Sequence, residues 1–316
     1  MNSPQPIWFT SANLQYLDRA AILSESMSQI HSDWTSALVL VDYLPKNSKK
    51  FYELTKYFNV IITPEELDIS NPQTWIPKYE TRQKIKNIGD WLSSLSIVEA
   101  CTAIKPFAFE FFAKSNLPVF YLDPDIVVFS SLNSVLNGLN EGSSIAVTPH
   151  ILSPSKNQQS IIDNEIATLK YGIFNFGFLA MDPNKENAKN FIDFWRERLK
   201  YFCSENTESG LFTDQKWGNL LPTFYEDLFI SRHPGMNVAN WNLENRKLSF
   251  DEKGNFQVNG EPLVFYHFSK AKNAGQQMTA RYAEENQVVA ELWRWYLSEL
   301  NKKQSIFLSH PWKYSK

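Results

Sequence analysis

The strand that decides the fold spans residues 119–129 and reads VFYLDPDIVVF. Two carboxylates, Asp123 and Asp125, interrupt an apolar run that is typical of a fully buried strand. Pro124 removes a backbone donor, so we expect the strand to break or turn at this residue. Burying carboxylates is costly unless a cation or dense hydrogen bonding compensates their charge. The segment therefore predicts two acidic groups presented at an edge of a sheet.

Two interpretations of this acidic pair follow from the residues. In one, Asp123 and Asp125 bind Mg²⁺ or Mn²⁺, which prefer oxygen ligands from carboxylates, phosphates and water. In the other, Asp-Pro-Asp is a solvated turn between two strands. The apolar residues on both sides favour the metal site, and a metal held in this way commonly neutralises a diphosphate.

The composition excludes several classes of protein. The chain has 316 residues, of which 43% are hydrophobic, and a formal net charge of −3, which argues against nucleic acid as a partner. Its two cysteines, Cys101 and Cys203, are too few for a disulfide framework and are not spaced like a zinc site. No apolar run is long enough to span a membrane, and residues 1–6 lack the features of a signal peptide. We therefore expect a cytoplasmic protein.

The first 130 residues alternate strand-like runs with helical patterns. We expect strands at residues 7–12, 37–41 and 60–63, and helices at 13–30, 51–58 and 96–113, the last interrupted by Pro106. Continuous apolar strands alternating with helices indicate an α/β fold with a mostly parallel sheet covered on both faces. Ligands bind such sheets at the carboxyl ends of the strands, where Thr10, Asp42 and Asp123 fall.

The second half of the chain is less regular. We expect strands at residues 144–148 and 174–181, a helix at 184–202, and a long amphipathic helix at 277–301. Residues 247–250, 256–258 and 263–267 read as three antiparallel strands joined by turns. The helix and the lysine-containing tail after it could touch the inner face of a membrane, although core packing is the better account of the helix. These elements predict one compact domain over residues 1–316.

Further candidate residues lie at the ends of these elements. His267 closes an apolar strand and could complete a metal site with the two acids, although a lone histidine there is more often a core residue. Lys270 and Lys272 follow it, and each could contact phosphate or belong to a solvated loop. Lys105, before Pro106, could point toward a phosphate or lie on the surface.

Two short polar motifs complete the set. Asn175 and Gly177 interrupt a bulky apolar strand, which indicates either close approach of a ligand or a bulge. Asp214 and Gln215 begin an apolar helical pattern, where they either cap the helix or face a cleft. The chain has no phosphate-binding loop, dinucleotide fingerprint or serine-hydrolase elbow motif.

Taken in order, these motifs resemble those of the metal-dependent, GT-A-fold glycosyltransferases of family 8, which include glycogenin and bacterial lipopolysaccharide galactosyltransferases. The likeness covers residues 7–269 and rests on Thr10-Ser11, Asn13-x-x-Tyr16-x-x-x-Ala20, a Lys105-bearing helix, Asp123-Pro124-Asp125, Asn175-Phe176-Gly177, Asp214-Gln215 and His267. It implies a Rossmann-like, mostly parallel sheet with a smaller antiparallel sheet. Residues 1–130 would form the nucleotide-binding half, 131–270 the sugar and acceptor half, and 277–316 a C-terminal helix and tail.

The resemblance also implies roles for individual residues. Mn²⁺ or Mg²⁺ would be held against the donor diphosphate by three residues, Asp123, Asp125 and His267. The donor nucleotide would lie near Thr10, Ser11, Tyr16, Lys105, Gly177 and Lys270, and the transferred sugar near Asn175, Asp214 and Gln215. The family usually follows its metal histidine with a glycine and a Lys-Pro-Trp group that grips phosphate. Here residues 268–272 read FSKAK instead, which leaves the phosphate-gripping cation open.

The implied reaction is transfer of a sugar from a nucleotide-diphosphate sugar, with UDP favoured, to an acceptor hydroxyl with retention of configuration. The acceptor could be a glycan, a lipid-linked sugar or a protein. Two alternatives are kept. Asp123-Pro124-Asp125-Ile126-Val127 also fits the nucleophile loop of dehalogenase-type phosphatases, although that loop usually follows the first strand. The chain could also be a degenerate nucleotide-sugar-binding protein without turnover.

Overall fold

The computed structural model describes residues 5–68, 87–271, 274–283, 285–304 and 307–315. Its strands are β1 Ile7–Ala12, β2 Thr35–Leu40, β3 Val60–Ile62, β4 Val119–Leu122, β5 Ile126–Val128, β6 Ile145–Pro149, β7 Phe174–Met181, β8 Leu228–Ile230, β9 Val238–Ala239, β10 Leu248–Phe250, β11 Phe256–Val258, β12 Glu261–Pro262 and β13 Phe265–His267. Its α-helices are α1 Leu17–Ile30, α2 Lys49–Thr55, α3 Ile88–Leu92, α4 Ile97–Ala103, α5 Lys105–Ala113, α6 Asn133–Asn140, α7 Gln158–Ser160, α8 Ala167–Tyr171, α9 Glu186–Phe202, α10 Leu221–Phe224, α11 Ala274–Ala283 and α12 Gln287–Lys302. Short helical turns of other types join them at η1 Leu14–Tyr16, η2 Pro64–Glu66, η4 Ile161–Ile166, η5 Thr207–Ser209, η6 Gln215–Leu220 and η7 Leu243–Asn245.

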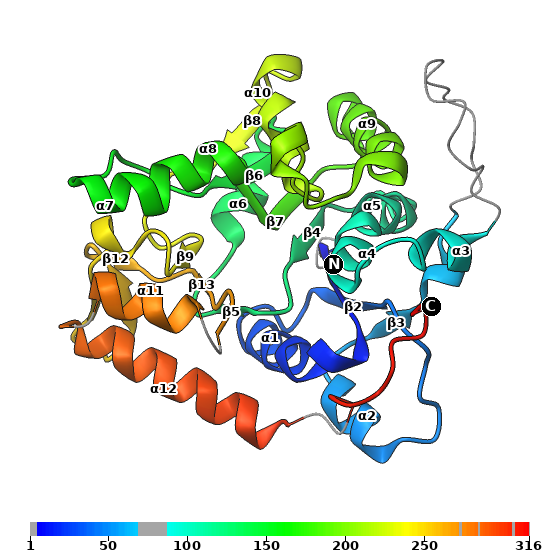
Figure 1. The fold of residues 1–316 in the computed structure, drawn as a ribbon, viewed down its shortest axis with the longest axis horizontal. Coiled ribbons are helices and arrows are strands. Elements are labelled where there is room, and N and C mark those ends of the chain that lie inside the picture. Colours follow the sequence, from blue (N-terminus) through cyan, green and yellow to red (C-terminus); the bar gives the residue numbers. More distant parts are fainter. Residues whose placement is uncertain (1–4, 69–86, 272–273, 284, 305–306, 316) are drawn as a thin grey trace.

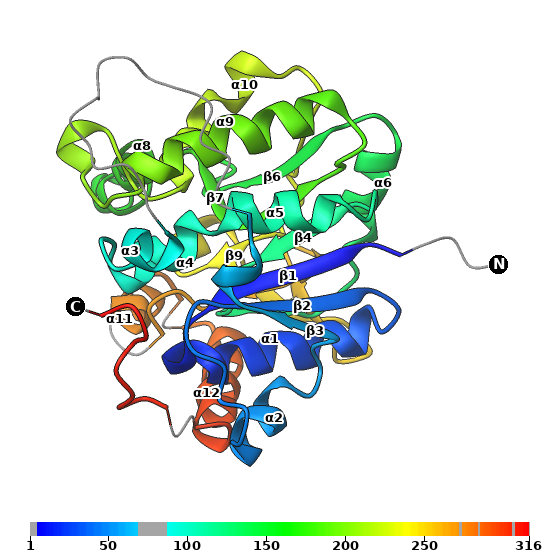
Figure 2. The same cartoon turned by 90° about the vertical axis from the view of Figure 1, so that its right-hand side faces the viewer.

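The central sheet has seven strands in the order β3-β2-β1-β4-β7-β6-β8 (Figures 1 and 2). Neighbouring strands pair in parallel except at β7, which is antiparallel to both β4 and β6. A separate antiparallel sheet contains β10, β11 and β12. The predicted fold class, a mostly parallel sheet with a smaller antiparallel sheet, is confirmed.

Helices cover both faces of the central sheet because successive strand residues point to opposite sides. Phe9 of β1 packs in one core with residues of α4, α5 and α9, whereas its neighbour Trp8 packs with residues of α1, α2 and α6. Both rings are almost fully buried. This two-sided burial explains why the strands read as nearly continuous apolar runs.

The strand at residues 119–129 breaks where the sequence predicted. β4 ends at Leu122, and β5 begins at Ile126 on the far side of Asp123-Pro124-Asp125. The break moves the chain from the central sheet into a third sheet with the order β5-β13-β9. The helix expected at 96–113 is also divided in two. α4 ends at Ala103, and α5 begins at Lys105 with Pro106 in its first turn.

Two predictions for the second half are wrong. Residues 263–267 do not form the third strand of the antiparallel sheet, because β12 occupies that position and β13 pairs with β5 and β9. The helix expected at 277–301 is divided into α11 and α12. Asn286 caps α12 by accepting from the backbone N–H groups of Val288 and Val289, which starts a new helix there.

The remaining elements agree with the expected ranges to within a few residues, and β1 and β7 have the predicted bounds. The apolar face of α12 packs on the third sheet, where Phe268 stacks on Tyr296 with 3.8 Å between ring centroids. Core packing therefore accounts for the amphipathic pattern of this helix. Among the described residues, no helix is long and apolar enough to cross a bilayer.

Candidate active site

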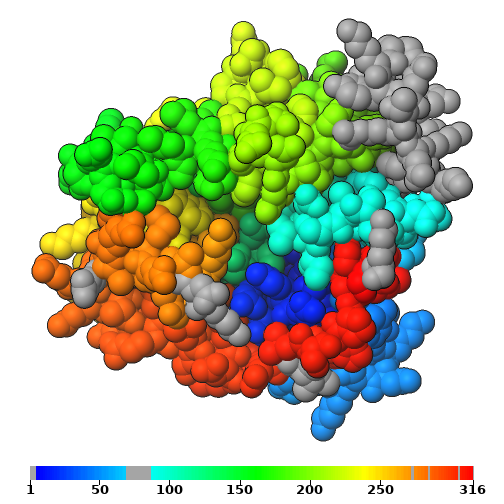
Figure 3. All heavy atoms as spheres, in the orientation of Figure 1, coloured from blue at the N-terminus to red at the C-terminus, as the bar shows by residue number. Residues whose placement is uncertain are grey.

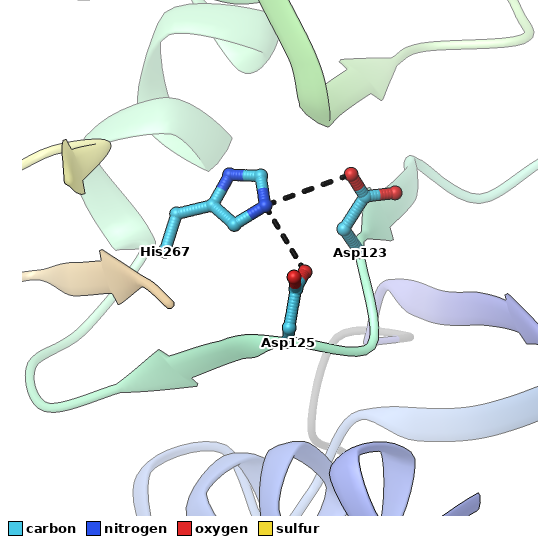
Figure 4. A group of neighbouring side chains, drawn as sticks. All are labelled: Asp123, Asp125 and His267. Atoms are coloured by element: carbon cyan, nitrogen blue, oxygen red, sulfur yellow. Dashed lines mark ion pairs between the residues drawn. The ribbon is translucent and has the colours of Figure 1, made fainter. Parts of the chain in front are cut away.

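Three side chains converge where the central sheet meets the third sheet (Figure 4). Asp123 follows β4, Asp125 precedes β5, and His267 ends β13. His267 Nε2 lies 3.0 Å from Asp125 Oδ1 and 3.8 Å from Asp123 Oδ2. One ligand atom from each residue lies within 4.8 Å of the others, close enough to hold one metal ion. The carboxylates are largely buried rather than part of a solvated turn, since their side chains are 26% and 15% exposed.

Backbone pairing fixes this cluster. The Asp123 N–H donates to the Gly177 carbonyl at 2.7 Å, which holds the end of β4 against β7. The Phe268 N–H donates to the Asp125 carbonyl at 2.9 Å, beside the antiparallel pairing of β5 with β13. Residues separated by more than 140 positions thus meet because the Pro124 break delivers the chain to both sheets.

Asn175 of β7 orients the imidazole ring. Its Oδ1 lies 3.1 Å from His267 Nδ1, so an Nδ1–H tautomer leaves Nε2 facing the two carboxylates. Burial alone would lower the pKa of His267, but the adjacent Asp125 carboxylate raises it above the ordinary value. Fixing a ligand histidine through its second nitrogen is a common feature of metal sites.

Gly177 leaves the space that the cluster occupies. A Cβ at this position would lie 2.5 Å from His267 Cε1, 2.7 Å from Asn175 Oδ1 and 2.9 Å from Asp123 Oδ2. Any larger residue would displace these side chains. A glycine is therefore required here, because the side chains of His267, Asn175 and Asp123 approach the backbone of this residue closely.

A buried lysine, Lys105, forms an ion pair with Asp123. Lys105 Nζ lies 3.4 Å from Asp123 Oδ1 and 2.9 Å from Asp214 Oδ2, and Tyr121 donates its hydroxyl to Asp123 Oδ1 at 2.5 Å. Burial alone would lower the pKa of Lys105, but the two carboxylates raise it above its ordinary value. The Lys105 side chain is only 2% exposed, so the expectation of a surface lysine is excluded.

Two of the three expected sugar-facing residues, Asn175 and Gln215, form one hydrogen-bonded group. Gln215 Oε1 accepts from Asn175 Nδ2 at 3.3 Å and from the Phe176 N–H at 3.1 Å. Asp214 is fully buried and paired with Lys105, and its side chain makes no cap hydrogen bond to the η6 turn that follows. The structure brings Asn175, Gln215 and the cluster together, whereas the Asp214 carboxylate lies in the protein interior.

His150, to which no role was assigned from the sequence, belongs to this group. Its Nε2 lies 3.2 Å from Asn175 Nδ2, and its ring packs edge-on against Trp241. Trp241 packs in the same way against His267, with 5.3 Å between ring centroids. Burial lowers the pKa of His150 to about 4. A signal was available, since His150 directly follows β6 at the carboxyl end of a parallel strand.

The expected nucleotide residues differ in accessibility. Thr10 is fully buried, and Ser11 donates to the Cys101 carbonyl at 2.7 Å and lies 3.1 Å from the Tyr121 hydroxyl. Tyr16 is 43% exposed and its ring lies 4.4 Å from the Arg19 guanidinium. The space-filling view shows a hollow bordered by the α8 segment above, the α11 segment below and the blue N-terminal segment (Figure 3).

The cations after β13 and the C-terminal tail complete the surroundings. Lys270 is exposed, and Lys272 lies outside the described residues. The tail returns to β2, where Trp312 Nε1 donates to the Val41 carbonyl at 2.8 Å and the Lys313 N–H donates to Asp42 Oδ1 at 3.1 Å. Asp42, at the carboxyl end of β2, is therefore occupied by the chain's own backbone.

Comparison with proteins of known sequence gives two relatives in Bacillus subtilis strain 168. The uncharacterized protein YfnD is 29% identical over 182 residues, which are 56% of this chain and 55% of the relative. The uncharacterized protein YfnF is 24% identical over 174 residues, or 54% of this chain and 56% of the relative. The chain spans about half the length of these curated relatives.

Comparison with solved structures shows which known proteins share this fold. A galactosyltransferase, LgtC, in complex with donor and acceptor sugar analogs aligns with a TM-score of 0.53 at 16% identity, covering 91% of this chain and 96% of that one. The apo form of the glycosyltransferase GlyE from Streptococcus pneumoniae TIGR4 aligns with a TM-score of 0.51 at 13% identity, covering 98% of this chain and 66% of that one. At these identities the likeness shows the GT-A fold. The family model of glycosyl transferase family 8 matches residues 9–231, and the chain belongs to that family.

Proposed function

We propose that this chain transfers a sugar from a nucleotide-diphosphate sugar to an acceptor hydroxyl, with a divalent metal at Asp123, Asp125 and His267. UDP-sugars are the favoured donors. The observation that carries the proposal is the convergence of two carboxylates and one oriented imidazole within 4.8 Å. Family membership supports glycosyl transfer as the reaction class.

The residues present fit Mn²⁺ or Mg²⁺. Two carboxylate groups and one imidazole are an appropriate donor set for Mn²⁺, and oxygen ligands suit Mg²⁺. Gly177 keeps the space free, and Asn175 directs His267 Nε2 toward the carboxylates. When bound, such a cation offsets the negative charge that develops on the departing diphosphate.

The chain's own residues would hold the site in place during the reaction. Tyr121 and Lys105 both contact Asp123 Oδ1, which leaves Oδ2 facing His267. Asn175 and Gln215 are the proposed contacts to the transferred sugar, where their amides would bond its hydroxyls. We assign Asp214 a positioning role through Lys105, because its carboxylate is buried in that ion pair.

The nucleotide would lie against the first half of the chain, residues 1–130, and the acceptor against residues 131–270. Near the base and ribose we propose Thr10, Ser11 and the exposed ring of Tyr16. Lys270, exposed just beyond β13, is a proposed contact to the diphosphate. The backbone at Gly177 is a second proposed contact. A nucleotide-binding half in this position agrees with the rule that ligands sit at the carboxyl ends of parallel strands.

Retention of anomeric configuration is part of the proposal. The reacting carbon passes through an oxocarbenium-like state, and the departing phosphate accepts the proton of the acceptor hydroxyl. A strong carboxylate base is then unnecessary, in keeping with the burial of Asp214 in its ion pair. NMR of the product would show an inverted anomeric centre if this part of the proposal is wrong.

A phosphatase and an inactive binding protein are the competing functions. A dehalogenase-type nucleophile loop follows the first strand, whereas Asp123 follows the fourth strand in chain order. Hydrolysis of a generic aryl phosphate would favour the phosphatase. Binding of a nucleotide sugar with metal, but without hydrolysis or transfer to any acceptor, would favour the inactive protein.

The test is a thermal-shift panel of UDP-, GDP-, CMP- and dTDP-sugars with Mn²⁺ and with EDTA. A ligand that binds the native state raises the unfolding temperature in proportion to the logarithm of its concentration over its Kd. We expect a UDP-sugar to stabilise the protein only when Mn²⁺ is present. A cytoplasmic location with peripheral contact at the inner membrane face is a separate expectation, which cell fractionation tests.

A further inference from the structure

A cavity of about 200 Å³, with Trp241 in its wall, lies beside the candidate active site. Its walls come from the loop after β6, the η4 turn, the η7 turn and the loop between β11 and β12. α7, β9 and β12, the elements nearest to these segments in the chain, lie together at one end of the molecule (Figure 1). None of the motifs in the sequence analysis accounts for this cavity.

Trp241 connects the cavity to the metal cluster. It lines the cavity, and its ring packs edge-on against His267 at 5.3 Å and against His150 at 5.5 Å. Asn242, also in the wall, donates to the His150 carbonyl at 3.0 Å. A molecule in the cavity would therefore lie one indole ring away from the proposed metal ligands.

Arg246 places a buried positive charge in the cavity wall. This arginine is 4% exposed, and its Nη1 donates a hydrogen bond to the Met236 carbonyl. Among the described residues, no carboxylate oxygen lies within 4.0 Å of its guanidinium nitrogens. Burial lowers the pKa of Arg246 to about 9. A buried cation without a counter-charge is destabilising, and a planar guanidinium binds carboxylate or phosphate best.

The neighbouring acid does not supply that charge. Glu244, two residues away, turns its Oε1 to the Ser160 hydroxyl at 2.7 Å and to the Lys156 N–H at 3.1 Å. Its Oε2 and the Oδ1 of Asn164, another wall residue, are buried without a hydrogen-bond partner in the described structure. The cavity wall thus contains the Arg246 guanidinium without a paired carboxylate, the Glu244 carboxylate with only Oε1 hydrogen-bonded, and the Asn164 amide oxygen without a partner.

We propose that this cavity is an acceptor subsite that binds a sugar carrying an anionic group, a carboxylate or a phosphate, through Arg246. The anion would receive hydrogen bonds from the guanidinium, and sugar hydroxyls would donate to Asn164 Oδ1. The subsite rests on the proposed sugar-transfer function, and Trp241, which lines the cavity and packs against His267, connects the two. Neither the family match nor the expected motifs assign a role to these residues.

The experiment measures binding of monosaccharide probes to the full chain by titration calorimetry, without nucleotide or metal. The probes are methyl β-D-glucuronoside, glucose 6-phosphate and neutral methyl β-D-glucoside. One charged hydrogen-bonded contact corresponds to about a tenfold or greater gain in affinity. We expect at least one anionic probe to bind about tenfold more tightly than the glucoside, and the stronger of the two identifies the source of the anion.

Three variants test how the charges of Arg246, Lys247 and Glu244 contribute to binding of the anionic probe. Arg246→Gln should remove the preference for the anionic probe, whereas Lys247→Gln, which alters an exposed neighbouring cation, should preserve it. Glu244→Gln removes a negative charge from the wall, so it should leave anion binding unchanged or tighter. A neutral-sugar site would instead weaken in Glu244→Gln, which provides a test even if Arg246→Gln does not fold.

Equal affinity for all three probes, or no binding of any of them, would overturn the proposal. Failure here is distinguishable from failure of the proposed function, because nucleotide binding is measured separately with Mn²⁺. If UDP-sugars bind and the anionic probes do not, only the subsite is wrong. If the anionic probes bind and no nucleotide does, the cavity is an anion-binding site, and its role as an acceptor subsite fails together with the sugar-transfer function.

Discussion

Lys105 Nζ lies 2.9 Å from Asp214 Oδ2 in the protein interior, and both side chains are at most 3% exposed. The lysine also reaches Asp123, so the ion pair connects Asp214, the residue before η6, with a proposed metal ligand. Lys105 is thus held behind the site, where it sets the position of Asp123. Lys270, three residues after the end of β13, is exposed instead.

The first prediction concerns this ion pair. Lys105→Met leaves two buried carboxylates without their cation, which should cost about 3–5 kcal/mol of unfolding free energy. Adding Asp214→Asn should recover part of that loss because one buried charge is removed. Urea denaturation of Lys105→Met, Asp214→Asn and the double variant measures the coupling. Lys50→Met, which breaks an exposed pair with Glu53, is the matched control and should cost less than about 1 kcal/mol. Strict additivity of the two core substitutions would contradict the account.

The second prediction concerns Gly177. In Gly177→Ala the new methyl group would overlap His267 Cε1 and Asn175 Oδ1, so Mn²⁺-dependent stabilisation by UDP should disappear. Gly89→Ala is a suitable control, since its nearest neighbour would be Asn87 Oδ1 at 3.3 Å. Thermal unfolding with and without Mn²⁺ and UDP measures the effect. An unchanged ligand-induced shift in a folded Gly177→Ala protein would show that the cluster is not the nucleotide-metal site.

The third prediction concerns Asn175. Without its Oδ1, His267 loses the partner that directs Nε2 to the carboxylates, so Mn²⁺ affinity should fall about 10–100-fold. Titration of Mn²⁺ followed by electron paramagnetic resonance gives the affinity directly, independently of turnover. Exposed Asn140→Ala serves as the control. Equal Mn²⁺ affinity in Asn175→Ala and the parent protein would remove the orienting role.

The fourth prediction is a pH dependence of stability. His31 accepts a hydrogen bond from the Leu132 N–H through Nε2, and burial lowers its pKa to about 4. In the unfolded chain histidine binds a proton near pH 6.5, so the unfolded state holds more protons between about pH 6.5 and 4. Stability from this residue is complete above that window and falls as the pH drops through it.

Denaturation at pH 7 and pH 5 measures this effect. Because His31 stays neutral in the folded protein, it should account for a loss on the order of 2 kcal/mol in the free energy of unfolding between pH 7 and pH 5. His31→Gln keeps a hydrogen-bond acceptor but cannot titrate, so its loss should be smaller than that of the parent protein. The exposed His310→Gln variant should behave like the parent. An identical pH profile for His31→Gln would contradict this assignment.

Local sequence patterns predicted much of the fold because the strands are buried on both faces. The bounds of β1 and β7 could be read directly from their mostly apolar, strand-like runs. The Pro124 break was equally readable, since proline and two acids leave few alternatives to a turn. The division between α11 and α12 was missed, although Asn286 is a recognisable cap residue.

Long-range pairing could not be read from these patterns. Whether residues 263–267 pair with β11 or with β5 depends on contacts between segments far apart in the chain, and the apolar run fits either. The metal site at Asp123 and Asp125 was predicted from the strand itself, with His267 as a candidate third ligand that the family resemblance supported, whereas no role was predicted for His150, Trp241 or Arg246. Their roles arise from side-chain packing in three dimensions, as does the Trp312 contact to the end of β2.

The central claim, that Asp123, Asp125 and His267 form a metal site for a nucleoside diphosphate, is tested most directly by calorimetric titration of UDP. The parent protein should bind UDP in Mn²⁺ and lose at least about tenfold in affinity in EDTA. Asp125→Asn should bind UDP equally weakly in both conditions, while Asp193→Asn, at an exposed position on α9, should behave like the parent. UDP affinity that is the same with Mn²⁺ and EDTA, or unchanged in Asp125→Asn, would contradict the claim.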